Sequence, residues 1–108
     1  MSSSFVALAR LRDIPDRGVL AVEAPGGERL CLIRLGAQVT ATRDACPHQA
    51  FPLSSGEVLD DDTLQCGWHG ARFDCRNGAV RQGPATDPLE MFDVRLDGDV
   101  ILVRGPGT

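Results

Sequence analysis

The chain has 108 residues, which is enough for one compact domain and too few for two. Eleven basic residues against fifteen acidic ones give a formal net charge of −4, which argues against a nucleic-acid-binding protein because phosphates require a basic face. No apolar run approaches the roughly 20 residues of a membrane-spanning helix, and no basic segment precedes the early apolar residues 5–9. We therefore expect a cytoplasmic protein with no signal peptide and no membrane partner.

Short apolar segments rich in β-branched residues recur between turn signals, a pattern typical of an all-β domain. The first four predicted strands are residues 5–9, 19–24, 29–35 and 38–43. Glycine-containing turns at 25–28 and 35–38 connect the last three of these strands. Residues 11–18 contain Pro15 and Gly18 and are expected to form a connection with one helical turn.

The character of the sequence changes between residues 44 and 88, where the predicted strands become short. They are residues 57–60, 63–66, 71–74 and 79–81. A closing hairpin of residues 90–96 and 100–104 follows, with Asp97-Gly98 as a type I′ turn signal. The sequence predicts one domain: an antiparallel β sandwich whose framework covers about residues 1–43 and 89–108, with a small insert, about residues 44–88, between its strands.

The insert carries two short loops that each combine a cysteine with a histidine. The first reads Cys46-Pro47-His48 and, after seventeen residues, the second reads Cys66-Gly67-Trp68-His69. Cysteines in a chain expected in a reducing compartment point to metal or redox chemistry. A [2Fe–2S] cluster with two thiolates on one iron and two neutral imidazoles on the other requires this set of residues. The same four side chains could instead hold a tetrahedral zinc ion.

The two loops belong to a longer pattern within the insert. Its parts are Cys46-Pro47-His48-Gln49, Cys66-Gly67-Trp68-His69-Gly70, Ala71-Arg72-Phe73-Asp74, Asn77-Gly78, Gly83-Pro84-Ala85 and Pro88-Leu89. This pattern resembles that of the Rieske ferredoxins, the small electron carriers of bacterial aromatic-ring-hydroxylating oxygenase systems. The resemblance implies one [2Fe–2S] cluster per chain, with Cys46 and Cys66 on one iron and His48 and His69 on the other. The insert is then a cluster-binding subdomain.

The resemblance also implies what the protein does. It would accept single electrons from a flavin-dependent NAD(P)H ferredoxin reductase and deliver them, as a monomer, to a terminal oxygenase. The chain shows no nucleophile–base pair, so we expect no catalysis by the protein alone. One alternative is the Rieske-like small subunit of a larger redox enzyme such as an assimilatory nitrite reductase. Another is a zinc-held structural module.

Four positions bear on the reduction potential. High-potential relatives carry an extra cysteine in each ligand loop and a serine and a tyrosine behind the second loop. This chain has Phe51, Trp68, Ala71 and Phe73 there. Each missing hydrogen-bond donor removes stabilisation of the electron-rich reduced cluster. The expected potential therefore lies near the low end of the Rieske range, at about −150 mV.

Two cysteines and an acidic run remain outside the ligand set. Cys31 has apolar neighbours in a predicted strand, which indicates a buried thiol, and Cys75 occupies a position where the family has no ligand. The acidic run is Glu57, Asp60, Asp61 and Asp62. It is expected to form a solvated turn, and the alternative is an edge that steers a basic partner toward the cluster.

Overall fold

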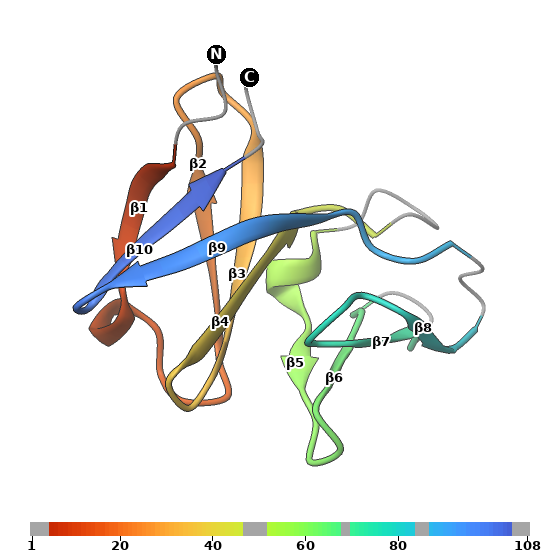
Figure 1. The fold of residues 1–108 in the computed structure, drawn as a ribbon. Coiled ribbons are helices and arrows are strands. Elements are labelled where there is room, and N and C mark those ends of the chain that lie inside the picture. Colours follow the sequence, from red (N-terminus) through yellow and green to blue (C-terminus); the bar gives the residue numbers. More distant parts are fainter. Residues whose placement is uncertain (1–4, 47–51, 68–69, 84–86, 105–108) are drawn as a thin grey trace.

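The computed structural model describes residues 5–46, 52–67, 70–83 and 87–104 (Figure 1). These residues form ten strands in two sheets together with two short 3₁₀ helices, and neighbouring strands in both sheets are antiparallel. The predicted all-β fold class is confirmed. Within the described ranges, no helix has the length and apolar character that crossing a membrane would require.

The large sheet contains six strands in the order β1-β10-β9-β4-β3-β2. Their bounds are Val6–Arg10 (β1), Val19–Glu23 (β2), Arg29–Leu35 (β3), Gln38–Arg43 (β4), Met91–Asp97 (β9) and Val100–Arg104 (β10). The 3₁₀ helix Leu11–Asp13 (η1) is the helical turn expected after the first strand. Two residue pairs, Ala41 with Phe92 and Thr42 with Met91, join β4 to β9 and so connect the strands β2-β3-β4 with β9-β10-β1 in one sheet.

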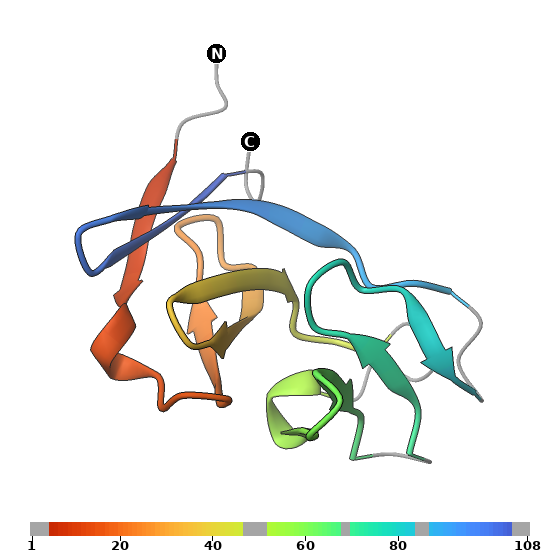
Figure 2. The same cartoon turned by 60° about the horizontal axis from the view of Figure 1, so that its bottom comes forward.

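The small sheet contains four strands in the order β5-β6-β7-β8 and lies to one side of the large sheet (Figures 1 and 2). Its strands are Glu57–Val58 (β5), Thr63–Gln65 (β6), Arg72–Asp74 (β7) and Val80–Gln82 (β8). The 3₁₀ helix Leu53–Ser55 (η2) precedes β5 and was not predicted. The strand predicted at 57–60 ends after Val58, because Leu59 and Thr63 close a tight turn with a 2.8 Å backbone hydrogen bond.

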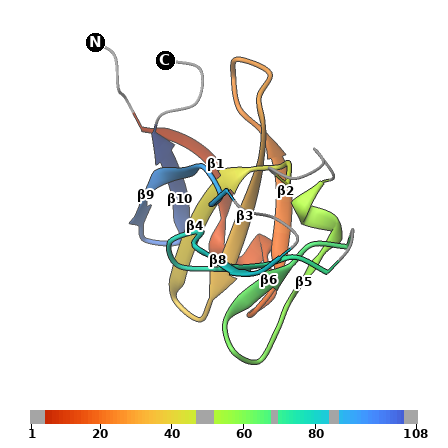
Figure 3. The ribbon, with the colours of Figure 1, turned by 90° about the vertical axis from the view of Figure 1, so that its right-hand side faces the viewer.

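Strand β3 separates two apolar cores. Its four consecutive buried residues are Leu30, Cys31, Leu32 and Ile33. Since side chains alternate between the two faces of a strand, four buried residues in a row require that both faces are covered. Leu30 and Leu32 belong to a core within the large sheet, and Cys31 and Ile33 belong to a second core shared with the small sheet. Figure 3, viewed from that side, shows the small sheet in front of β3 and β4.

The closing hairpin turns one residue later than the sequence predicted. Asp97 pairs with Val100, so Gly98 and Asp99 are the two central residues of the turn. Gly98 has φ +63°, a left-handed conformation that glycine adopts without steric strain. The Asp97-Gly98 prediction of a type I′ turn is therefore wrong, because the register of β9 on β10 places Asp97 within the strand pairing.

Candidate metal centre

Cys46 begins the first ligand loop, three residues after the end of β4. The backbone N–H of Asp44 donates to the carbonyl of Arg29 at 2.9 Å, which extends the pairing of β4 with β3 by one residue beyond the strand. Cys46 is only 1% exposed and belongs to the core between β3 and the small sheet. The first predicted iron ligand thus lies in the buried core, three residues after the end of β4.

Cys66 follows the last residue of β6. Its backbone N–H donates to the carbonyl of Ala71 at 2.7 Å and closes the second ligand loop at its base. Gly70, just before this contact, has φ +72°, which a residue with a side chain would adopt only with strain. Cys66 is also 1% exposed and belongs to the same core as Cys46. Two loops about 20 residues apart thus contribute their cysteines to one buried cluster of side chains.

The surroundings of these two cysteines fit a Rieske cluster. The same core contains Leu53, Leu64, Ala71, Phe73 and Leu89, each at most 5% exposed. An apolar shell of this kind limits the access of water to an iron–sulfur centre and influences its potential. Ala71 and Phe73, which lie two residues apart behind the second loop, have no hydroxyl to offer a cluster sulfur.

The predicted ligand set stays a prediction. His48 and His69 lie outside the described residues, as do Phe51 and Trp68. The ranges that are described contain two of the four proposed ligands and show no group of three or more His, Cys, Asp or Glu side chains placed to hold a metal ion. The four cysteines, all within those ranges, form no disulfide bond.

A carboxylate that the sequence analysis missed closes the first ligand loop. Asp44 is 8% exposed, and its two carboxylate oxygens accept hydrogen bonds from the backbone N–H and the hydroxyl of Ser54, both at 2.8 Å. The contact joins the residues on either side of the loop that begins at Cys46. A separation of ten residues matches no periodic pattern, so the sequence offered no signal for this pair.

A close backbone approach connects the two ligand loops. Gly56 ends η2 with φ −87°, and a Cβ atom at this position would lie 2.0 Å from the carbonyl oxygen of Gln65. Gln65 is the residue before Cys66. Only glycine allows this approach, so Gly56 sets how closely the end of the first loop packs against the strand that leads to the second.

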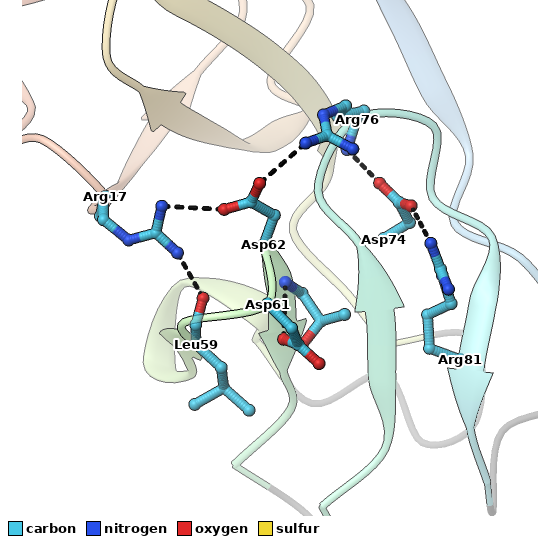
Figure 4. Close-up of polar contacts among 8 residues, drawn as sticks. Arg17, Leu59, Asp61, Asp62, Asp74, Arg76 and Arg81 are labelled. Atoms are coloured by element: carbon cyan, nitrogen blue, oxygen red, sulfur yellow. Dashed lines mark hydrogen bonds and ion pairs between the residues drawn. The ribbon is translucent and has the colours of Figure 1, made fainter.

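The acidic run divides into two pairs of residues with different surroundings. Asp61 accepts a 2.6 Å hydrogen bond from the Thr63 hydroxyl, and this bond is the main reason why the pKa of Asp61 lies below its usual value. Asp62 forms ion pairs of 2.8 Å with both Arg17 and Arg76 (Figure 4). Glu57 and Asp60 are exposed and make no ion pair with the described part of the chain.

Asp62 attaches the small sheet to the large one. Arg17 lies just before β2, and its guanidinium also donates to the carbonyl of Leu59 (Figure 4). The carbonyl of Asp62 accepts from the backbone N–H of Cys75 at 3.0 Å, while the carbonyl of Cys75 accepts from the Thr40 hydroxyl at 2.6 Å. Of the run predicted as a solvated turn, Glu57, Asp60 and Asp61 are exposed, whereas Asp62 joins the two sheets.

Cys31 and Cys75 are buried in the same core as Cys46 and Cys66. Both are 0% exposed, which confirms the predicted burial of Cys31. Burial raises the pKa of the Cys31 thiol strongly, and burial with the nearby Asp62 and Asp74 raises the pKa of the Cys75 thiol to about 11. At neutral pH both groups are therefore neutral thiols, which are poor nucleophiles.

Comparison with known proteins identifies the family of this chain. Residues 4–93 match the family model of the Rieske [2Fe-2S] domain. The ferredoxin component of the p-cumate 2,3-dioxygenase system of Pseudomonas putida is 32% identical over 101 residues, which cover 94% of this chain and 86% of that protein. The predicted resemblance to Rieske ferredoxins is confirmed.

Two solved structures show the same fold. The ferredoxin of carbazole 1,9a-dioxygenase from Nocardioides aromaticivorans has a TM-score of 0.86 at 30% identity, with 94% of this chain and 97% of that chain covered. A chain in the complex of reduced oxygenase and oxidized ferredoxin in carbazole 1,9a-dioxygenase has a TM-score of 0.85, also at 30% identity, with 96% and 95% covered. The likeness thus extends over nearly the whole length of each protein.

Proposed function

The chain belongs to the Rieske [2Fe-2S] domain family, and we propose that it is a soluble, cytoplasmic one-electron carrier of an aromatic-ring-hydroxylating oxygenase system. Its cofactor is a Rieske-type [2Fe–2S] cluster. The observation that carries the proposal is the convergence of Cys46 and Cys66, from two separate loops, in one buried core. When bound, the cluster takes up and releases one electron at a time.

The chain holds the cluster with four residues under this proposal. Cys46 and Cys66 supply thiolates to one iron, and His48 and His69 supply ring nitrogens to the other. The described contacts support the cysteine half of this assignment, because the framework strand β4 and the base of the second loop place both thiols in the same core. Leu53, Phe73 and Leu89 would keep water away from that side of the site.

The relatives support an oxygenase as one partner. Proteins similar to this chain are ferredoxin components of dioxygenase systems, and one similar ferredoxin occurs in a complex with its oxygenase. We propose that this chain passes electrons to a terminal oxygenase that acts on an aromatic substrate, and that a flavin-dependent NAD(P)H reductase supplies them. A monomer suits this role, since transient redox encounters use small interfaces.

The proposal includes a low reduction potential. Ala71 and Phe73 are both 0% exposed in the core that holds Cys66, and neither side chain can donate a hydrogen bond. Without such donors the extra negative charge of the reduced cluster is less stabilised. A potential near about −150 mV would match this environment.

A potentiometric titration of the purified holoprotein, followed by low-temperature electron paramagnetic resonance, tests the proposal. We expect a Rieske-type signal that titrates near about −150 mV. Cys46→Ser and Cys66→Ser should lose this signal, whereas Cys75→Ser, a matched variant in the same core, should keep it. A colourless protein with no reducible centre would overturn the proposal in favour of a zinc-held module. Stable co-purification with a larger redox enzyme would favour a subunit role over a shuttle.

A further inference from the structure

The structure assigns to Asp44 and Ser54 a positioning role for the cluster: their contact closes the first ligand loop before the cluster binds, and the charge of Asp44 lowers the reduction potential. This inference rests on the ligand role proposed above for Cys46 and His48. Asp44 is one of the few buried charged side chains in the described ranges, and both of its oxygens accept hydrogen bonds from Ser54.

The contact joins a residue before the first ligand loop to a residue after it. Asp44 precedes Cys46 by two residues, and Ser54 follows the loop as the middle residue of η2. A buried carboxylate is unfavourable unless hydrogen-bond donors satisfy it, and here the donors come from the far side of the loop. Opening the loop would therefore remove both of these hydrogen bonds from the carboxylate. A loop whose ends are already held loses less conformational entropy when it binds its ligand.

Both ends of the Asp44–Ser54 contact are also fixed to neighbouring strands. The backbone of Asp44 is bonded to Arg29 in β3, so one end of the contact belongs to the large sheet. At the other end, η2 buries Leu53 completely and terminates at Gly56, which packs against the carbonyl of Gln65. Asp44 and Ser54 thus set the position of Cys46 relative to Cys66, the two thiols that would both have to reach one iron.

The charge of Asp44 acts on the same interior. Both of its oxygens accept hydrogen bonds from Ser54, as the burial of a carboxylate requires. Asp44 is 8% exposed and lies two residues before Cys46, which belongs to the same core as Cys66. A negative charge at this place disfavours the addition of an electron to a nearby cluster, because like charges interact strongly where water is excluded.

Three variants separate the two effects. Asp44→Ala removes the loop contact and the charge, Ser54→Ala removes one hydrogen bond and leaves the charge, and Asp44→Asn removes the charge but keeps a side chain that can pair with Ser54. Thr42→Val is the control for a buried hydrogen bond, since the Thr42 hydroxyl donates a 2.8 Å hydrogen bond to the Glu90 carbonyl and does not join the two sides of the loop. Asp99→Asn is the control for a surface charge.

The measurements use the holoprotein: the rate of cluster bleaching by an iron chelator, and the midpoint potential. Asp44→Ala and Ser54→Ala should bleach about tenfold faster or more, the scale of one hydrogen bond to a charged group, while Thr42→Val bleaches as the parent does. Asp44→Asn should bleach within about threefold of the parent. Asp44→Asn and Asp44→Ala should both raise the potential, whereas Ser54→Ala and Asp99→Asn should not.

Each half of the inference can fail separately. Equal bleaching rates for Ser54→Ala and Thr42→Val would overturn the loop-closing role, even if Asp44→Ala failed to fold. An unchanged potential in Asp44→Asn would overturn the role of the charge. If Cys46→Ser kept the parental resonance signal, the ligand assignment itself would be wrong, a result distinct from either of these.

Discussion

Arg17 and Asp62 both have left-handed backbone conformations, with φ of 61° and 64°, and their side chains form a 2.8 Å ion pair between the two sheets. Such conformations are unfavourable for residues other than glycine, although asparagine and aspartate tolerate them best. Asp62 also pairs with Arg76 at 2.8 Å. The two strained turns are therefore held to each other by the contact that attaches the small sheet to the large one.

Asp62→Asn should loosen this attachment without changing the backbone, because asparagine also accepts the left-handed conformation. We expect the melting temperature of the holoprotein to fall by about 2–5 °C, since exposed ion pairs contribute little singly and more in a network. Asp99→Asn, which removes the 3.0 Å pair with Arg10 inside the large sheet, is the matched control. Equal melting temperatures for the two variants in differential scanning calorimetry would contradict the bridging role.

Asp74 should make stability depend on acid pH. Its pKa lies below the usual value of 3.8, mainly because Arg81 donates a 2.8 Å hydrogen bond and secondly because the Arg76 backbone N–H donates another. A lowered pKa in the folded state stabilises the protein fully above the usual value, and this contribution is lost as pH falls through the folded pKa.

Melting curves of the parent and Asp74→Asn between about pH 2 and pH 7 test this dependence. Above about pH 5 the parent should melt at a higher temperature than Asp74→Asn, by a margin that does not change with pH. Below about pH 4 this difference in melting temperature should shrink. Asp97→Asn, at the exposed end of β9, is the control and should have the melting temperature of the parent at each pH. A margin that stays constant down to the lowest pH would show that Asp74 contributes no pH-dependent stability.

Gly56→Ala should disturb the cluster site through sterics alone. The added methyl group would meet the Gln65 carbonyl at 2.0 Å, so the backbone on one side must shift, at a cost of about 1–3 kcal/mol. Gly36→Ala is the control, because Gly36 has φ +62° but no atom within 4 Å of the new Cβ. We expect reduced iron content and faster cluster loss in Gly56→Ala alone, measured by iron analysis and visible absorption.

Cys31 and Cys75 should resist alkylation in the folded holoprotein. With a pKa of about 11, roughly one Cys75 thiol in a thousand is a thiolate at pH 8, and Cys31 has still fewer. Iodoacetamide at pH 8 should therefore label neither residue within the time that modifies a small free thiol completely. Mass spectrometry of tryptic peptides measures the labelling, and rapid stoichiometric modification of Cys75 would show that it is accessible.

The sequence predicted most of the strands because the local signals were strong. The bounds 29–35, 38–43 and 100–104 agree with β3, β4 and β10, where β-branched residues and glycine turns mark the ends. The closing turn was misplaced because strand register depends on pairing with neighbours, and Asp97 is drawn into the pairing with Val100. Residue type near the turn could not reveal this.

The candidate site was predictable where chemistry is carried by residue type. The spacing of cysteine and histidine in the two loops pointed to Cys46 and Cys66, which the structure brings into one core. Contacts that support the loops were not predictable, because they join positions without a periodic relation. Asp62 is hydrogen-bonded to Arg17, 45 residues away in the sequence, and Asp44 is hydrogen-bonded to Ser54, ten residues away. Such pairs become visible only when the fold places them together.

Ala71→Ser and Phe73→Tyr should raise the reduction potential. Both positions are fully buried behind the second ligand loop, in the core of Cys66. A hydroxyl that donates to a cluster sulfur stabilises the reduced state, and a hydrogen bond to a charged acceptor is worth about 1.5–3 kcal/mol. Because about 59 mV corresponds to a tenfold change for one electron, each variant should shift the potential upward by at least about 60 mV.

Ala41→Ser is the control for this pair of variants, since Ala41 is equally buried but belongs to the other core. It introduces the same hydroxyl and the same desolvation penalty at a place without a cluster. Its potential should equal that of the parent in a spectroelectrochemical titration. If Ala71→Ser and Phe73→Tyr also matched the parent while retaining the Rieske signal, the absence of donors at these positions would not explain a low potential, and charges such as Asp44 would have to account for it.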